Sequence, residues 1–289
     1  MRILVALDQH SYSNSAVREA AKLAMNTWAD VTLLGICPKT GPKNAQEVLE
    51  HPITKALGNH RQEFLGYFQG KDSPYNTQKS KNEFVEVKKH VWEELPADRG
   101  AIKDLKIRIR QGNAAKAILA ESYEEGIDLV VIGCDKDNKC LWENANVPQK
   151  IANDAACSVL VVKDETTANK IVCCLDHDTV SQESLEMINQ MVTFHKAELE
   201  IIGLTDGEEL KVEVERKVDA ILKYYTARQL MPLIQLVETA ALESFVSQEA
   251  QHSLMALWMG EKSMLEKIFP PKKVGKLVRT SQSSVLILR

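Results

Sequence analysis

Asp128-Leu129-Val130-Val131-Ile132-Gly133 is the stretch of sequence that decides the fold. Its four consecutive apolar residues lie between a carboxylate and a glycine, which is typical of a strand buried on both faces of a parallel sheet. A helical segment with Ile151 and Ala152 follows, and a second apolar run extends from Ser158 to Val162. Strands that alternate with helices in this way predict an α/β fold, with helices on both faces of the sheet.

The beginning of the chain has the same pattern, and the pattern occurs twice. Ile3 to Asp8 is an apolar run that ends at a carboxylate, and a shift of 168 residues places it without a gap over Ile171 to Asp176. The same shift places Ser13 over Ser181, and each serine is predicted to cap the helix that follows it. Such internal similarity indicates two copies of one structural unit.

Each copy is predicted to run β-α-β-α-β-α-β-α-β. We therefore expect two tandem, doubly wound α/β domains with five-stranded parallel sheets, at residues 1–163 and 170–289, joined by the polar segment 163–169. Residues 38–83 contain several prolines and glycines and are predicted to form a long, partly irregular excursion in the first copy. In such folds ligands bind at the carboxyl ends of the strands.

The composition argues against several classes of protein. The net charge is -4, which does not favour binding to nucleic-acid phosphates. The first apolar run is too short for a secretory signal, and no stretch approaches the roughly 20 apolar residues of a membrane span. We therefore expect a cytoplasmic protein with no membrane partner. Six cysteines without a Cys-x-x-Cys pair predict reduced, mostly buried thiols and no metal site.

The layout resembles the universal stress protein family over nearly the whole chain. Four segments carry the resemblance: residues 3–8, Gly112 with the helix of Ile118, residues 128–133, and residues 151–162, which end in Ala155-Ala156-Cys157-Ser158-Val159-Leu160-Val161-Val162. The resemblance implies the fold shared with adenine nucleotide alpha hydrolases. It also implies a stress-linked role and, as in the nucleotide-binding members, a site for ATP or AMP in domain 1.

The implied nucleotide site lies at the strand ends of domain 1. The residues assigned to it are Leu7, Asp8, Ile36, Gly112, Ile132 and Gly133. Asp8 and Asp176 match the family aspartate that meets the adenosine part of a nucleotide, and the alternative is that each caps a loop or a helix. Gly133 would let a phosphate approach the backbone, or would only turn the chain after a strand.

The phosphate-binding motif is incomplete in both copies. In members that bind ATP the fourth strand leads into G-x-x-G-x9-G-[S/T], and this chain keeps the first glycine, as Gly133 and Gly260. The other positions hold Lys136, Asn146 and Val147 in the first copy and Ser263, Lys273 and Val274 in the second. Lys136 and Lys139 would contact phosphate as point charges or belong to a solvated loop. We therefore expect nucleotide binding that is weak or lost.

Three classes of function follow. The first is a non-enzymatic stress-response binding or regulatory protein with an unidentified protein partner, and the second is an ATP or AMP sensor that uses domain 1. The third is an ATP pyrophosphatase-like enzyme, whose Ser-Gly-Gly loop is replaced here by Gln9-His10-Ser11. The sequence has no H-E-x-x-H, G-x-S-x-G or Walker motif, so no enzyme is predicted. The final strands, Ser158–Val162 and Ser284–Leu288, are predicted to pair and form a pseudo-dimeric monomer, with a homodimer as the alternative.

Overall fold

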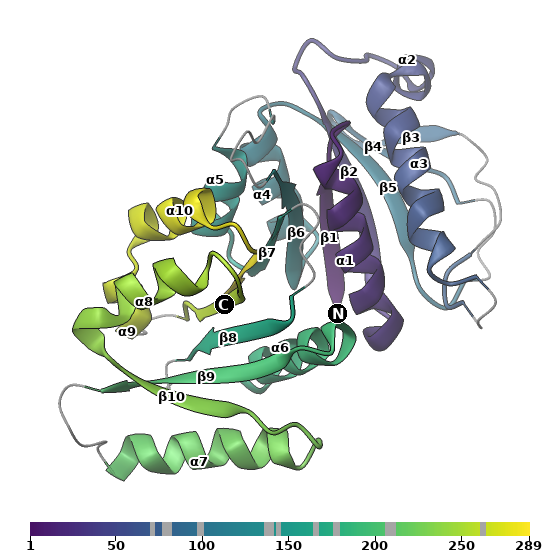
Figure 1. The fold of residues 1–289 in the computed structure, drawn as a ribbon. Helices are drawn as coiled ribbons and strands as arrows, with labels where there is room; N and C mark the ends of the chain where they lie inside the picture. Colours follow the sequence, from purple (N-terminus) through teal and green to yellow (C-terminus); the bar gives the residue numbers. More distant parts are fainter. Residues whose placement is uncertain are drawn as a thin grey trace. The chain divides into compact units, whose positions relative to one another are not determined.

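The chain forms two compact α/β units, residues 1–164 and residues 165–289 (Figure 1). The computed structural model describes residues 1–69, 73–76, 83–96, 101–135, 142, 146–163, 168–175, 180–205, 212–260 and 264–289. Strands alternate with helices in both units, and the α/β class with a mostly parallel sheet is confirmed. The predicted domains, 1–163 and 170–289, each lie inside one unit, and their independence as folding domains stays a prediction.

The first unit contains seven strands and five helices among the described residues. The strands are β1 (Arg2–Leu7), β2 (Asp30–Cys37), β3 (Phe84–Lys88), β4 (Val91–Glu94), β5 (Leu105–Gln111), β6 (Leu129–Cys134) and β7 (Ser158–Lys163). The helices are α1 (Tyr12–Thr27), α2 (Ala45–Glu50), α3 (Pro52–Gly66), α4 (Ala114–Glu124) and α5 (Val147–Asp154). The strand order is β7-β6-β1-β2-β5-β4-β3, and the first five of these strands are parallel.

The second unit repeats the parallel part of the first. Its strands are β8 (Lys170–Cys174), β9 (Glu198–Thr205), β10 (Leu233–Glu238), β11 (Leu254–Trp258) and β12 (Val285–Leu288). Its helices are α6 (Gln182–His195), α7 (Val212–Thr226), the short 3₁₀ helix η1 (Thr239–Ala241), α8 (Leu242–Glu249), α9 (Met264–Ile268) and α10 (Pro271–Thr280). The parallel order β10-β9-β8-β11-β12 has the same topology as β5-β2-β1-β6-β7.

A two-stranded extension of the first sheet was not expected from the sequence. Strand β4 pairs with β5 in antiparallel register, with Val91 opposite Arg110, and β3 pairs with β4 in the same sense. The parallel part of the sheet has the five predicted strands, and the hairpin adds two more. The predicted excursion at residues 38–83 contains helices α2 and α3, so this part of the chain is more regular than its prolines and glycines indicated.

The core lies between the sheet of the first unit and its helices. Residues 3–7 of β1 are fully buried, as expected for a central strand. Helix α1 buries an apolar stripe of Ala16, Ala20, Leu23 and Ala24 and packs against α3, while α4 packs against α5 (Figure 1). Right-handed crossovers with this strand order place the two helix pairs on opposite faces of the sheet. The carboxyl ends of β1 and β2 therefore open toward the first turn of α1.

Buried ion pairs connect the β3–β4 hairpin and helix α4 to strand β5. The Arg108 guanidinium donates to Glu93 on β4 at 2.5 Å and to the fully buried Glu121 on α4 at 2.7 Å. Arg110, two residues further along the strand, forms ion pairs with Glu121 and Glu124. Breaking one partner of such a network leaves an uncompensated buried charge, so these contacts fix the position of β4 on β5.

Of the two predicted helix caps, Ser181 and Ser13, the structure confirms only the first. Ser181 accepts a hydrogen bond from the backbone N–H of Ser184 at 3.1 Å and caps α6, which confirms that prediction. The prediction for Ser13 is wrong, because α1 already begins at Tyr12 and Ser13 is buried in its first turn. The Ser13 hydroxyl instead donates to the Asp8 carboxylate at 2.8 Å.

The cysteines are mostly buried, as predicted. Cys37, Cys157, Cys173 and Cys174 are free thiols, and burial raises the pKa of Cys173 and Cys174. Cys134 is disulfide-bonded, so the expectation of reduced thiols is wrong for this residue. Within the described ranges, no helix has both the length and the apolar content needed to cross a bilayer.

Candidate functional site

A small cleft lies at the carboxyl ends of β1 and β2 in the first unit. Its volume is about 200 Å³, and its walls include the predicted site residues Leu7, Asp8 and Ile36. Ala114, at the start of α4, and Trp142 complete much of the lining. Pockets for drug-sized ligands usually have volumes of roughly 300 Å³ or more. This cleft is therefore better suited to a single ring system. The structure therefore brings three predicted residues together around a mostly apolar cavity.

The Asp8 carboxylate is held by the residues that follow it. One oxygen accepts hydrogen bonds from the His10 backbone N–H at 2.9 Å and from the Ser13 hydroxyl at 2.8 Å. The other oxygen accepts a hydrogen bond from the Tyr12 hydroxyl. A carboxylate has about four acceptor positions, so three are used within the chain. Asp8 thus organises the turn into α1, as the local alternative predicted, and keeps little capacity for a ligand.

The remaining predicted site residues do not line this cleft. Ile132 is fully buried inside β6. Gly133 follows it, and a side chain there would overlap the backbone of Tyr12. Gly112 has a φ of +140°, which side-chain-bearing residues rarely adopt, and a β-carbon there would meet nothing within 4 Å. Its N–H donates to the carbonyl oxygen of Cys37 at 2.9 Å, so it holds the end of β5 next to the end of β2.

Sequence reasoning missed several residues that form the cleft. Ile53, in the first turn of α3, reaches the cleft from a part of the chain that was expected to be partly irregular. Trp142 is buried and also lines the cavity. Its indole N–H donates to the carbonyl oxygen of Gly133 at 3.4 Å. Its position between the end of β6 and the start of α5 was the one available signal.

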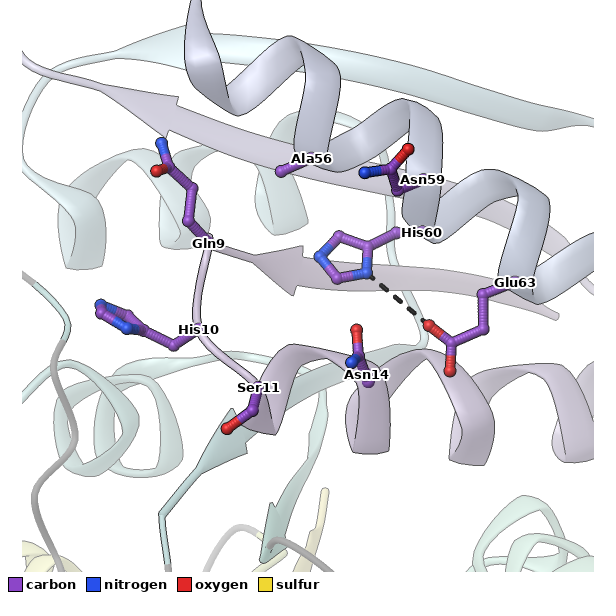
Figure 2. Close-up of a pocket in the computed structure, with 8 residues that line it drawn as sticks. All are labelled: Gln9, His10, Ser11, Asn14, Ala56, Asn59, His60 and Glu63. Carbon is purple, nitrogen blue, oxygen red and sulfur yellow. Dashed lines mark ion pairs between the residues drawn. The ribbon is translucent and has the colours of Figure 1, made fainter.

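A second, more polar cavity lies beside the cleft, between α1 and α3 (Figure 2). Its volume is about 370 Å³, and it shares Gln9 and His10 with the cleft. Buried His60 and half-buried Glu63 come from α3, and Asn14 comes from α1. Figure 2 shows the His60 ring and the Glu63 carboxylate side by side, one turn apart on α3, with the ion pair between them. Burial raises the pKa of Glu63, against the opposing effects of His60 and Arg18.

One thiol lies close to an imidazole near the cleft. The Cys37 sulfur is 3.6 Å from Nδ1 of His51, a spacing that resembles a nucleophile and its base. Two observations argue against that role. Cys37 is fully buried, and the same Nδ1 accepts a hydrogen bond from the backbone N–H of Ile53 at 3.3 Å, which caps α3. The pair is therefore part of the structural support for α3.

Several predicted positions fall outside the described residues. These are Asp176, Lys136, Lys139 and Ser263. Four of the substituted positions of the phosphate motif are described. Asn146 precedes α5 without capping it, and Val147 is buried at its start. In the second unit Lys273, on α10, forms an ion pair with Glu243, and Val274 is buried. In the second unit Glu238 is exposed at the end of β10, and its register partner Thr205 makes it the counterpart of Gln111, one residue before Gly112. Among the described residues, no three His, Cys, Asp or Glu side chains gather closely enough to hold a metal ion.

Comparison with known proteins relates the chain to one family. The model of the universal stress protein family matches residues 1–163. A universal stress protein from Archaeoglobus fulgidus has a similar fold, with a TM-score of 0.60 at 12% identity, covering 100% of this chain and 98% of the other. A functionally unknown protein, PA1789 from Pseudomonas aeruginosa PAO1, aligns with a TM-score of 0.56 at 16% identity, covering 99% and 92%. No curated protein sequence matches the chain.

Proposed function

Because the chain belongs to the universal stress protein family, we propose that it is a non-enzymatic stress-response binding or regulatory protein whose first unit holds the nucleoside part of an adenine nucleotide weakly. The observation that carries the proposal is the cleft at the ends of β1 and β2. It is small, mostly apolar and located where doubly wound sheets bind their ligands. Leu7, Ile36 and Trp142 would contact a base by van der Waals packing and stacking.

The negative charge around the cleft indicates that the phosphates of a nucleotide would contribute little to its affinity. Among the described residues, the lining of the cleft includes the Asp8 carboxylate and neither lysine nor arginine. Asp135 follows β6 directly and adds a second carboxylate near the strand ends. Phosphate groups would meet this negative charge without a compensating cation in the described part of the cleft, and like charges repel even when partly screened. Affinity should therefore come from the nucleoside.

The proposal of no enzymatic activity rests on how the polar side chains near the cleft are used. Asp8 accepts three hydrogen bonds from its own turn, and His51 caps α3 while it contacts the buried Cys37. A general base must reach the proton it removes, and a nucleophile must reach the substrate. Both groups are committed to holding the local structure. A protein partner, still unidentified, would then carry the biological signal.

Calorimetric titration with adenosine, AMP and ATP tests the proposal. We expect all three ligands to bind more weakly than roughly 10 µM, and adenosine at least as tightly as AMP and ATP, because the phosphates meet negative charge and add no favourable contact. Ala114→Leu fills the cleft and should abolish binding. Ala227→Leu, an exposed position at the end of α7, is the matched control and should change nothing. ATP binding much tighter than adenosine binding, or binding unaffected by Ala114→Leu, contradicts the proposal.

The alternative function, an ATP or AMP sensor that uses the first unit alone, rests on the same cleft. It requires that the phosphates be recognised, so it predicts that AMP or ATP binds clearly more tightly than adenosine. Mass spectrometry of the denatured purified protein separates the two proposals further. A stoichiometric co-purified nucleotide favours the sensor, and its absence together with weak adenosine binding favours the regulatory protein.

A further inference from the structure

The apolar cleft and the polar cavity lie along one face of helix α3. Ile53 lines the cleft, and Ala56, His60 and Glu63 line the cavity. These residues are three or four positions apart, so successive turns of the helix place them in one row, about 15 Å long. Figure 2 shows the last three following one another along α3. Because residues 9–10 line both spaces, the cleft and the cavity adjoin and form one groove.

The two ends of this groove differ in chemistry. The cleft end is mostly apolar, with Leu7, Ile36 and Trp142 in its lining. The cavity end presents three side-chain amides and one hydroxyl, those of Gln9, Asn14, Asn59 and Ser11. An amide both donates and accepts hydrogen bonds, so it matches the hydroxyl groups of a ligand. The groove therefore suits a compound with a flat ring system at one end and several hydroxyl groups at the other.

Two of these amides are available to a ligand. Asn14 extends from α1 and Asn59 from α3, on opposite walls of the cavity (Figure 2). Both side chains are exposed, and neither forms a hydrogen bond with any residue in the described part of the chain. The Asp8 carboxylate, in contrast, is already used within its own turn. Hydroxyl groups of a ligand would thus bind to the two asparagines before they bind to Asp8.

The far end of the groove disfavours a phosphate group. Glu63 lies there and forms an ion pair with His60 at 3.9 Å. Within the described lining of the cavity there is neither lysine nor arginine. A phosphate would therefore approach a carboxylate without a free cation to compensate the repulsion. A sugar without phosphates meets no such cost.

From these contacts we propose that the cleft and the cavity form a single binding site for a free nucleoside, whose sugar lies between α1 and α3 with its hydroxyl groups bound to Asn14 and Asn59. The inference rests on the proposed function for the position of the base. It adds the direction of the sugar, along α3, and it defines the class of ligand as a nucleoside rather than a nucleotide.

Three compounds with the same base test the position of the sugar in the full-length protein. Adenine and adenosine should both shift the backbone NMR signals of Leu7 and Ile36, and only adenosine should also shift those of Asn14 and Asn59. 2′,3′-Dideoxyadenosine lacks two hydroxyl groups, so it should bind at least roughly fivefold more weakly than adenosine.

The outcomes separate this inference from the proposed function. If adenosine shifts the same residues as adenine and binds no more tightly than 2′,3′-dideoxyadenosine, the sugar does not lie in the cavity, while the base still occupies the cleft. If none of the three compounds gives saturable shifts, both proposals are wrong.

Variants at the cavity end give an independent test. Ala56→Leu places a larger side chain in the cavity, so it should weaken adenosine binding at least roughly fivefold and leave adenine binding unchanged. Replacing both Asn14 and Asn59 with Ala should reduce the affinity for adenosine to that for 2′,3′-dideoxyadenosine. The matched control replaces Asn26 and Gln62 with Ala, because both are exposed on the same two helices outside the lining.

Melting temperatures show whether each variant is folded. Adenosine binding that survives both Ala56→Leu and the double asparagine variant would overturn the inference, even if Ala114→Leu abolishes it.

Discussion

The backbone oxygen of Tyr12 occupies the position that a side chain on Gly133 would need. A β-carbon on Gly133 would overlap that oxygen and lie 2.9 Å from the Tyr12 carbonyl carbon. The first turn of α1 therefore packs directly on the backbone of β6. A glycine that the family resemblance relates to phosphate binding is required here by packing, whether or not a nucleotide binds. The stability of a Gly133 variant in the absence of nucleotide separates packing from nucleotide binding.

Gly133→Ala should destabilise the first unit by about 1–3 kcal/mol, because backbone atoms have to shift to admit the new methyl group. Gly58→Ala is the matched control, since a β-carbon on Gly58 in α3 meets nothing within 4 Å. Alanine in a helix is more favourable than glycine, so this variant should gain about 0.5–1 kcal/mol. Urea denaturation without nucleotide measures both effects. Unchanged stability of Gly133→Ala would contradict the packing explanation.

Because Lys163 is buried, the free energy of unfolding should depend on pH in the alkaline range. Burial lowers the pKa of Lys163 from 10.5 to about 8, although the Asp135 carboxylate opposes this shift. Between pH 8 and 10.5 the unfolded chain binds more protons at this residue than the folded chain, so its contribution makes stability rise with pH. Below pH 8 the full cost of burying the charged lysine remains, on the order of 3 kcal/mol.

Lys163→Met should remove that slope and stabilise the protein at pH 7, as measured by denaturation at several pH values. Lys150→Met is the control, since Lys150 is exposed on α5. If both variants keep the slope of the parent protein between pH 8 and 10, the effect does not come from Lys163.

His51 should produce a second pH dependence, in the acidic range. Burial lowers the pKa of His51 below its usual 6.5, and Nδ1 needs its lone pair to cap α3. Below pH 6.5 the unfolded chain takes up the proton more readily than the folded chain, so stability falls with falling pH. His51→Asn keeps a capping group without the titration and should reduce this fall. His90→Asn, at an exposed position, should leave the fall unchanged.

The pairing of the final strands, β7 and β12, stays a prediction from the sequence. Each strand is apolar and stands last in the parallel strand order of its own unit. Replacing both Val285 and Ile287 with Asp should separate the two units without unfolding the first, detected by limited proteolysis and light scattering. The same change at Leu233 and Leu236, which are exposed on β10, is the control. Units that stay associated in the Val285 and Ile287 variant would contradict the pairing.

The parallel strands could be predicted because their sequence directly reflects their burial. Residues 3–7 and 129–132 are continuous apolar runs, and both are fully buried in the structure. The hairpin could not be predicted in this way. Val85 and Val87 on β3 are exposed and alternate with charged residues, so no apolar run marks this strand. Its position depends instead on ion pairs between residues far apart in the sequence, such as Glu93 with Arg108.

The candidate site was only partly predictable for a similar reason. Leu7, Asp8 and Ile36 were implied by the family resemblance. They lie at the carboxyl ends of strands, where such folds bind ligands, and the structure places all three around the cleft. Ile53 and Ala114 reach it from the starts of two helices, and only the three-dimensional packing of those helices shows this. The role of Gly133 also depends on packing, because its neighbour Tyr12 is 121 residues away along the chain.

The hairpin has a consequence for the solubility of the first unit. Without it β5 would end the sheet with a row of open backbone hydrogen-bonding groups, a surface on which strands of other molecules readily assemble into aggregates. The hairpin moves that border to β3, whose five residues include Glu86 and Lys88 and whose register with β4 shifts between them. Short length, charge and an irregular register all make a poor template for intermolecular β-structure, so the first unit is protected against fibril growth from this side.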